Sequence, residues 1–336
     1  MTACVVVAIL AWEPNARHPS AQERRELALA NAMPRSTIRK AVAPALVAIT
    51  TLLLALIFTH PFTAEIQAGE LELTMLDVGQ GDATLLVTPE GSTILVDTGG
   101  LGGYSSSTRL DTGEDIVAPY LWKRGMQRID TLVLSHLDFD HAGGAPAILR
   151  IFRPRHLWLA IPSAPHPLLD LVRAAAQAAG VETVTRHAGE RWESGGVTWR
   201  VLHPLANEHV QVGTAKHSND DSLVLHAQYK AASVLFTGDI HQTGEQAMLS
   251  RGGVPHADVL KVAHHGSRTS TGDAFLDAVS PSVALVSVGW LNSHGHPNAA
   301  VAERLASRGV ALFRTDRDGA ITLRTDGHRW RYEAAR

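Results

Sequence analysis

A single short segment constrains the fold of this chain more than any other part of its sequence. The apolar run Thr131–Leu134 is followed directly by SHLDFDHAGG (135–144), in which two histidines and two aspartates stand within six residues. The first three of these side chains alternate along the chain, so an extended backbone directs them to one side, and a turn can bring the fourth beside them. Carboxylates held this close repel one another unless a cation lies among them. The segment therefore predicts a divalent-metal site at the end of a buried strand, with the ligands His136, Asp138, Asp140 and His141.

Polar side chains also end two later apolar runs. Asp239 closes LFTGDI (235–240), where a buried carboxylate without a partner would be costly, and we expect it to bridge two metal ions. LKVAHHGS (260–267) contains His264 and His265, whose side chains point to opposite faces of an extended chain, so we expect only one of them to reach a metal. Because the chain has a single cysteine, the ligands must come from His, Asp and Glu.

Short apolar runs alternate with helical patterns from Leu71 onward. Two hairpins resemble each other, because the stretches that begin at Asp82 and Asp221 each reach a Thr-Gly pair sixteen residues later. This order of elements predicts an α/β fold in which two sheets lie between outer helices, an αββα sandwich. The predicted strands are 71–76, 84–88, 93–96, 131–134, 156–160, 197–202, 222–226, 233–236, 259–262, 283–288, 311–314 and 320–324. The predicted helices are 116–124, 167–179, 244–251, 271–279 and 299–308.

The segment AVAPALVAITTLLLALIF (41–58) is uncharged and just long enough to approach the thickness of a bilayer core. Arg35, Arg39 and Lys40 precede it, and residues 61–76 contain no Lys or Arg, which by the positive-inside rule places later residues outside the cytoplasm. A buried helix and a cleavable signal peptide are the alternatives. The sequence thus predicts a single-pass membrane protein with a membrane-proximal segment (1–40), a transmembrane helix (41–60) and an extracytoplasmic hydrolase domain (69–334).

The charge balance restricts how this chain could bind nucleic acid. Its formal net charge is -3, so no global positive field draws it to DNA or RNA, and any such contact must be local. Histidine is the informative excess, because several of the 18 histidines stand in tight clusters instead of being scattered. That pattern indicates a site rather than a purely structural domain.

Seven motifs, in chain order, resemble those of the C-terminal hydrolase domain of the ComEC family of DNA-uptake proteins, which has the metallo-β-lactamase fold. They are LDVGQGDA (76–83), ILVDTGG (94–100), SHLDFDHAGG (135–144), NDDSLVL (219–225), LFTGDI (235–240), LKVAHHGS (260–267) and GHPN (295–298). Members of that family carry this domain after a polytopic membrane channel. The resemblance therefore implies a metallo-β-lactamase αββα sandwich preceded by remnants of the channel at Val5–Trp12 and 41–58, with most of the channel missing.

The resemblance also implies how the motifs share the metal ions. His136 and Asp138 would hold one ion, and Asp239 would be shared with a second. The ligands of that second ion would be Asp140, His141 and one of His264 and His265. Asp138 stands where the superfamily commonly has histidine, and this harder oxygen ligand favours manganese or magnesium relative to zinc. The superfamily's third-motif histidine is missing, since Asn219-Asp-Asp221 stands in its place, so the first metal site is expected to be weak.

The remaining motif residues receive roles from the same resemblance. Asp140 and His296 are the expected catalytic residues, with His296 contacting a phosphate oxygen or protonating the leaving group. Ser267 or Arg268 would bind a neighbouring phosphate. Four further side chains would orient the ligand imidazoles, the alternative being that they only tighten turns. These are Asp77, Gln80, Asp82 and Asp97.

The resemblance implies a membrane-tethered, metal-dependent hydrolase, a phosphodiesterase or nuclease that acts on single-stranded or double-stranded DNA during uptake in competence. Its cofactor would be one or two divalent ions, Mn or Zn first and Mg as an alternative. The expected partners are DNA, the membrane and a separately encoded DNA channel or uptake machinery. One alternative is a hydrolase of a small phosphodiester or choline-phosphate ester, since one site architecture serves several ester classes. The other is a non-catalytic binding module of a DNA-import complex, which the intact metal motifs argue against.

Overall fold

The structure is a computed structural model of the chain, and it describes residues 20–22, 35–59, 64–100, 110–160, 162, 165–206 and 218–335. The chain divides into two compact units, Met1–Thr63 and Ala64–Arg336. Every strand among the described residues belongs to the second unit. All of the predicted site residues lie in that unit as well.

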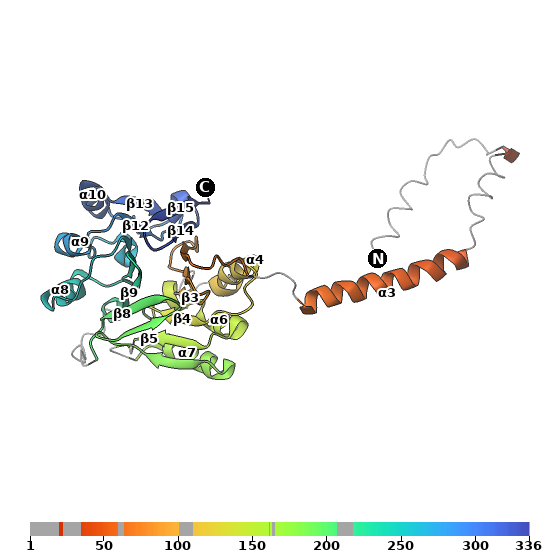
Figure 1. Cartoon of the computed structure of the whole chain (residues 1–336), viewed down its shortest axis with the longest axis horizontal. Coiled ribbons are helices and arrows are strands. Elements are labelled where there is room, and N and C mark those ends of the chain that lie inside the picture. Colours follow the sequence, from red (N-terminus) through yellow and green to blue (C-terminus); the bar gives the residue numbers. More distant parts are fainter. Residues whose placement is uncertain are drawn as a thin grey trace. The chain divides into compact units, whose positions relative to one another are not determined.

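The first unit contains the helix α3 (Arg35–Thr59), which includes the apolar segment 41–58 (Figure 1). Within the described ranges, however, no helix combines the length and the apolar character that crossing a membrane requires. The predicted transmembrane helix at 41–60 and the predicted single-pass membrane location are therefore wrong. The segment Val5–Trp12 lies outside the described residues.

The second unit contains two large β-sheets (Figure 1). The first has eight strands in the order β15-β14-β1-β2-β3-β4-β5-β6, and the second has seven in the order β13-β12-β11-β10-β9-β8-β7. The strands of the first sheet are β1 (Leu71–Met75), β2 (Thr84–Val87), β3 (Thr93–Val96), β4 (Thr131–Leu134), β5 (His156–Leu159), β6 (Glu182–Thr185), β14 (Ile321–Thr325) and β15 (Trp330–Ala334). Those of the second are β7 (Arg191–Ser194), β8 (Val197–His203), β9 (Val224–Tyr229), β10 (Ala232–Phe236), β11 (Val259–Lys261), β12 (Val283–Val286) and β13 (Ala311–Arg314).

Three apolar cores hold the layers together. One, which includes Leu73, Trp199 and Leu225, lies between the two sheets. The others lie on the outer faces of the sheets, under helices. The helices of the unit are α4 (Ala118–Lys123), α5 (Phe139–Ala142), α6 (Ala145–Phe152), α7 (Pro167–Ala179), α8 (Gln242–Ser250), α9 (Asp273–Val279), α10 (Ala299–Ser307) and α11 (Thr315–Asp318), with the short helices η1 (Gly113–Val117), η2 (Ser218–Asp221) and η3 (Ala263–Gly266). Since burying a large apolar side chain contributes about 1.5–3 kcal/mol, these cores are the main source of stability, and the predicted αββα sandwich is confirmed.

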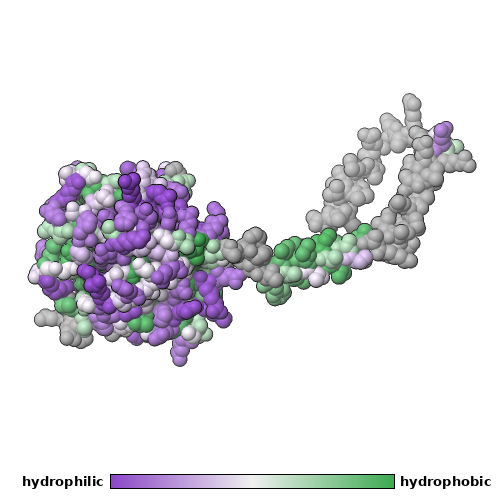
Figure 2. Space-filling view, viewed as in Figure 1, coloured by the Kyte–Doolittle hydropathy of each residue, from purple (hydrophilic) through white to green (hydrophobic). Residues whose placement is uncertain are grey.

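Most of the polar side chains of this fold lie on its surface. The visible surface of the second unit is mostly hydrophilic, with apolar residues scattered singly (Figure 2). The helix α7 illustrates the cause, because Leu168 and Val172 point inward while Arg173 on the next position is exposed. The apolar side chains of the helices and strands thus pack between the layers. Charged groups that are nevertheless buried must have partners inside the protein.

The parallel strands bring those buried charged groups together. β3 to β6 pair in parallel in one sheet, and β10 to β13 do so in the other. The carboxyl ends of parallel neighbours meet at one edge of a sheet. Asp97 directly follows β3, Ser135 directly follows β4, and Asp239 and His265 follow β10 and β11 within a few residues. Sequence segments far apart therefore deliver their polar side chains to the same edge.

The loop between β1 and β2 reaches this edge because of one glycine. Gly81 has a φ of +138°, and a Cβ added there would lie 2.4 Å from the backbone oxygen of Asp140, so only glycine fits without a shift. The next residue, Asp82, donates its backbone N–H to the same oxygen at 3.0 Å. This close approach places the Asp82 side chain against α5, although more than fifty residues separate the two in sequence.

Candidate metal centre

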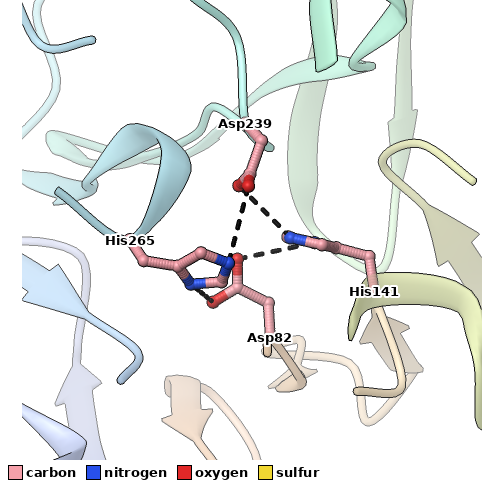
Figure 3. A group of neighbouring side chains, drawn as sticks. All are labelled: Asp82, His141, Asp239 and His265. Atoms are coloured by element: carbon pink, nitrogen blue, oxygen red, sulfur yellow. Dashed lines mark ion pairs between the residues drawn. The ribbon is translucent and has the colours of Figure 1, made fainter. Parts of the chain in front are cut away.

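Four buried side chains meet at the shared edge. Asp82, His141, Asp239 and His265 each offer a possible ligand atom, and these atoms all lie within 4.8 Å of one another (Figure 3). They come from four different places: the β1–β2 loop, α5, the turn after β10 and η3. Two imidazoles and two carboxylates in one buried cluster form a donor set that divalent metals prefer.

The two imidazoles are oriented alike. Nε2 of His141 lies 3.3 Å from Oδ1 of Asp239, and Nε2 of His265 lies 3.5 Å from Oδ2 of the same carboxylate. Nδ1 of each ring instead faces Asp82, at 3.6 Å from His141 and 3.8 Å from His265. Asp239 and Asp82 therefore lie on opposite sides of the imidazole pair (Figure 3). Asp140 joins the Nε2 side, because its Oδ2 lies 3.3 Å from Nε2 of His265.

Hydrogen bonds at Nδ1 fix which ring nitrogen is available. Nδ1 of His265 donates to the backbone oxygen of Ser287 at 2.9 Å, and Nδ1 of His141 lies 2.9 Å from Oδ2 of Asp97. Asp97 is itself held by the backbone N–H and the hydroxyl of Ser135, both at 2.7 Å. With the proton of a neutral ring on Nδ1, the lone pair is on Nε2, which faces Asp239. Both rings are thus presented as Nε2 ligands.

A buried lysine completes the cluster. Lys261, at the end of β11, is only 5% exposed, and its ammonium contacts the Asp82 carboxylate, Oδ1 of Asp239 at 3.2 Å and the backbone oxygen of Gly238 at 2.8 Å. Burial lowers the pKa of Lys261, but the carboxylates of Asp82 and Asp239 outweigh burial and hold that pKa above its usual value. Asp82 therefore lies behind the imidazoles and pairs with the ammonium, which is the position of a side chain that orients ligands.

The charge of the cluster is balanced by protons in the absence of an ion. Burial lowers the pKa of His141, but the carboxylates of Asp239 and Asp97 outweigh it and raise that pKa well above its usual value. Burial raises the pKa of Asp239, but the positive charges of His141, His265 and Lys261 outweigh it and hold that pKa well below its usual value. The cluster therefore requires positive charge at the Nε2 atoms, supplied either by protons or by a cation.

A second observation indicates that these side chains could bind a divalent cation. Nε2 of His136 is buried and makes no hydrogen bond within the described residues, and the buried Nε2 of His141 and carboxylate of Asp82 have only ion-pair contacts, with Asp239 and Lys261. Buried polar atoms are normally hydrogen-bonded, and ligand atoms of a metal site are the common exception. Two imidazole nitrogens with the oxygens of Asp140 and Asp239 suit Zn, Mn or Fe and do not select one of them.

Comparison with known proteins agrees with this geometry. The profile of the Metallo-beta-lactamase superfamily matches residues 76–290, which span the cluster from Asp82 to His265. The chain belongs to this superfamily. It is 32% identical over 276 residues to ComE operon protein 3 of Bacillus subtilis (80% of this chain, 34% of that protein) and 34% identical over 254 residues to Competence protein ComA of Neisseria gonorrhoeae (75% and 32%). It is 33% identical over 272 residues to Recombination protein 2 of Haemophilus influenzae (81% and 31%).

These relatives confirm the predicted resemblance to the ComEC family, and this metallo-β-lactamase superfamily member spans about a third of the length of each of them. Among solved structures it resembles the diiron β-hydroxylase CmlA of Streptomyces venezuelae, with a TM-score of 0.51 and 15% identity over 77% of this chain and 55% of that one. At that level of identity the likeness shows the fold alone.

The predicted metal ligands fall into two groups in the structure. His141, Asp239 and His265 lie in the cluster, with Asp140 at its edge. His136 is buried beside them, with its ring centre 4.1 Å from that of His141, and burial together with His141 lowers the pKa of His136 to about 4. Its Nε2 lies 3.8 Å from Oδ2 of Asp138, which is about one-third exposed. These two predicted ligands of the first metal ion therefore face each other directly beside the four-residue cluster.

The adjacent residues His264 and His265 direct their side chains differently, as the sequence pattern predicted. Both have φ near +52°, in the left-handed region that L residues rarely occupy. His265 turns into the cluster, whereas His264 is half-buried at its margin, with Nε2 at 3.9 Å from Oδ2 of Asp239. The ring centre of His264 lies 6.0 Å from that of His296. The structure thus places His265 within the cluster and His264 at its partly exposed margin.

Five other predicted site residues lie outside the cluster. Asp77 accepts the backbone N–H of Gly79 at 3.4 Å, and Oε1 of Gln80 accepts that of Gly289 at 3.5 Å, so both brace turns. The hydroxyl of Ser267 lies 3.0 Å from that of Thr269, and Arg268 is exposed. His296 is held through its backbone, whose N–H donates to Oδ1 of Asn292 at 3.0 Å. Burial and the nearby His265 and His264 lower the pKa of His296 to about 4, so its ring is neutral at pH 7.

Replacing Asp97 by asparagine tests how strongly ring orientation governs the site. Asparagine keeps the shape and can still accept from Ser135, but it removes the charge that holds the Nδ1 proton of His141. We expect the affinity for Mn²⁺ or Zn²⁺ to fall by about 10- to 100-fold. Titration calorimetry of the full chain measures this change. An Asp97→Asn protein that is folded and has unaltered affinity would contradict the orienting role.

Proposed function

We propose that this protein is a metal-dependent phosphodiesterase that cleaves DNA during its uptake. The observation that carries the proposal is the buried cluster of Asp82, His141, Asp239 and His265 in a metallo-β-lactamase superfamily fold. The choice of substrate is supported by the names of relatives, which refer to competence and recombination. DNA is thus the proposed substrate and partner of this chain.

The proposed reaction is hydrolysis, in which the oxygen of water bonds to phosphorus, the P–O bond to the leaving oxygen breaks, and that oxygen takes up a proton. The ligands of the cation would be His141, His265, Asp239 and Asp140. A divalent ion bound there lowers the pKa of water and stabilises negative charge on a phosphodiester. Lys261 fixes Asp239 by holding its Oδ1, so that Oδ2 remains directed at Nε2 of His265.

The rim of the cluster offers groups for the substrate. His264 and His296 stand beside each other at its margin, and His296 is neutral at pH 7 because its pKa is about 4. A neutral imidazole can donate a hydrogen bond to a phosphate oxygen without a permanent charge. We therefore assign His296 to orienting the phosphodiester rather than to protonating the leaving group, the other role that the sequence suggested.

One observation favours a second candidate, the hydrolysis of a small phosphodiester. The chain has a net charge of -3, and a polymer with one negative charge per phosphate is repelled by such a surface unless a local basic site holds it. A small diester needs no such site.

A substrate comparison decides between the two functions. The full chain is incubated with a 20-nucleotide single strand, a duplex of the same sequence and a chromogenic small phosphodiester, each in Mn²⁺, in Zn²⁺, in Mg²⁺ and in EDTA. Metal-dependent cleavage of the oligonucleotides supports the nuclease. Hydrolysis of the small diester alone supports the second candidate, and no hydrolysis by a folded, metal-loaded protein would overturn both.

A further inference from the structure

A second pocket lies away from the metal centre, on the second sheet. Its volume is about 440 Å³, and it is formed by the edge strand β7, its neighbour β8, the turn before them and the C-terminal end of α8. Three arginines line it, together with small and apolar residues and one carboxylate: Arg191 on β7, Arg200 on β8 and Arg251 after α8. Arg191 and Arg200 are direct partners in the register of the two strands, so their side chains leave the sheet side by side. We refer to this feature as the arginine pocket.

The positive charge of the arginine pocket is not cancelled at Arg191 and Arg200. Glu190, the carboxylate in the lining, is engaged by Arg186 at 2.8 Å and by the backbone N–H of His187 at 2.6 Å. Across the described parts of the chain, neither Arg191 nor Arg200 forms an ion pair with a carboxylate oxygen within 4.0 Å. Nε of Arg200 is moreover buried without a hydrogen-bond partner among those residues. Two neighbouring guanidinium groups without a carboxylate partner leave positive charge in the pocket, which suits an anion.

The helix α8 links the arginine pocket to the metal centre. Its N-terminal side begins at His241, whose ring centre lies 5.2 Å from that of His264 at the margin of the cluster. Its C-terminal side ends at Arg251, in the pocket. Nine residues of α-helix span about 13 Å. At a rise of about 3.4 Å of helix axis per phosphate in one strand of a duplex, this distance corresponds to about four nucleotides, and to fewer in an extended strand.

We propose that the arginine pocket binds a backbone phosphate of a nucleic-acid strand whose scissile bond lies at the metal centre. This inference rests on the proposed nuclease function and assigns it a second contact, two to four nucleotides from the reacting phosphorus. Guanidinium groups bind phosphate oxygens through paired, charge-assisted hydrogen bonds, which matches the two side-by-side arginines. The pocket is also the local basic site that an acidic chain needs in order to hold a polyanion.

The test is a double variant, Arg191→Gln with Arg200→Gln, in the full chain. Binding of a fluorescent 20-nucleotide single strand is measured by anisotropy at several salt concentrations, with Ca²⁺ or EDTA present to prevent cleavage. We expect the dissociation constant to rise about tenfold at 0.1 M salt and the salt slope to fall by about 1, because each single-strand phosphate contact contributes about 0.7. Hydrolysis of a dinucleotide, which is too short to reach the pocket, should be retained.

The matched control is Arg173→Gln, which removes an exposed arginine from α7 on the other side of the sandwich. Unchanged affinity and salt slope in the double variant would overturn the inference, as would an equal loss in Arg173→Gln. Loss of dinucleotide hydrolysis in the double variant would also overturn it, because the pocket would then act through the fold of the metal centre. A wild-type protein that binds the strand through these arginines but cleaves no phosphodiester in any metal would overturn the proposed function and leave the phosphate site standing.

Discussion

Replacement of Asp239 by asparagine is expected to lower metal-dependent phosphodiester hydrolysis by at least about a thousandfold. The substitution keeps the shape of the side chain and removes the carboxylate that faces Nε2 of both His141 and His265. Without it the two imidazoles have no shared anion to hold a cation between them. The initial rate of cleavage of the small diester and of the 20-nucleotide strand, in Mn²⁺ and in Zn²⁺, measures the loss.

The control for this experiment is Asp258→Asn. Asp258 accepts the backbone N–H of Ser233 at 2.8 Å, just before β11, so its replacement disturbs the same sheet at the opposite end of its parallel strands. We expect the control to keep most of the activity. If Asp239→Asn retained more than a tenth of the wild-type rate, or if both variants lost activity equally, Asp239 would not be the anion at the centre of the site.

The second large effect is expected from Lys261→Met, and it concerns stability. Methionine keeps the length of the side chain but removes the ammonium that contacts Asp82 and Asp239, so two buried carboxylates lose their cation. Breaking a buried ion pair by removing one partner costs about 3–5 kcal/mol. Urea denaturation of the full chain in EDTA measures the free energy of unfolding. Added Mn²⁺ should stabilise the variant more than the wild type, because the ammonium competes with the cation for the same carboxylates.

Two further variants serve as controls for Lys261→Met. Lys261→Arg keeps the charge and should lose less stability than Lys261→Met. Lys230→Met removes an exposed lysine that donates to the backbone oxygen of Asp326, and it should change the free energy of unfolding by less than about 1 kcal/mol. A Lys261→Met protein as stable as Lys230→Met would show that the ammonium does not hold the cluster together.

The sequence predicted the layers of the fold well where strands are buried. The strands β3, β4 and β13 lie where the apolar runs place them, and β1 and β11 end one residue early. Three strands were not predicted because their side chains are mostly exposed and carry little apolar alternation: β6, β7 and β15. The helix α6 was also missed, since it is short, follows Gly143-Gly144 and has a proline in its first turn.

The site was predictable only in part, for a physical reason. A carboxylate or an imidazole that follows an apolar run can be recognised in the sequence, as Asp239 and His141 were. The partner that a buried charge finds across the fold does not. Lys261 lies in the apolar run LKVA and was not predicted as a site residue, because its partner Asp82 belongs to the other sheet. The one signal was a lysine inside a buried strand, which requires an anion somewhere nearby.

We expect His141, His265 and Asp239, with Asp140 at the edge of the cluster, to hold a divalent ion. The most direct test is elemental analysis of the full chain after removal of metals with EDTA and dialysis against micromolar Mn²⁺ or Zn²⁺. We predict at least one ion per wild-type chain and a large loss of bound metal in Asp239→Asn. A folded wild-type protein that retains no divalent ion under these conditions would contradict it.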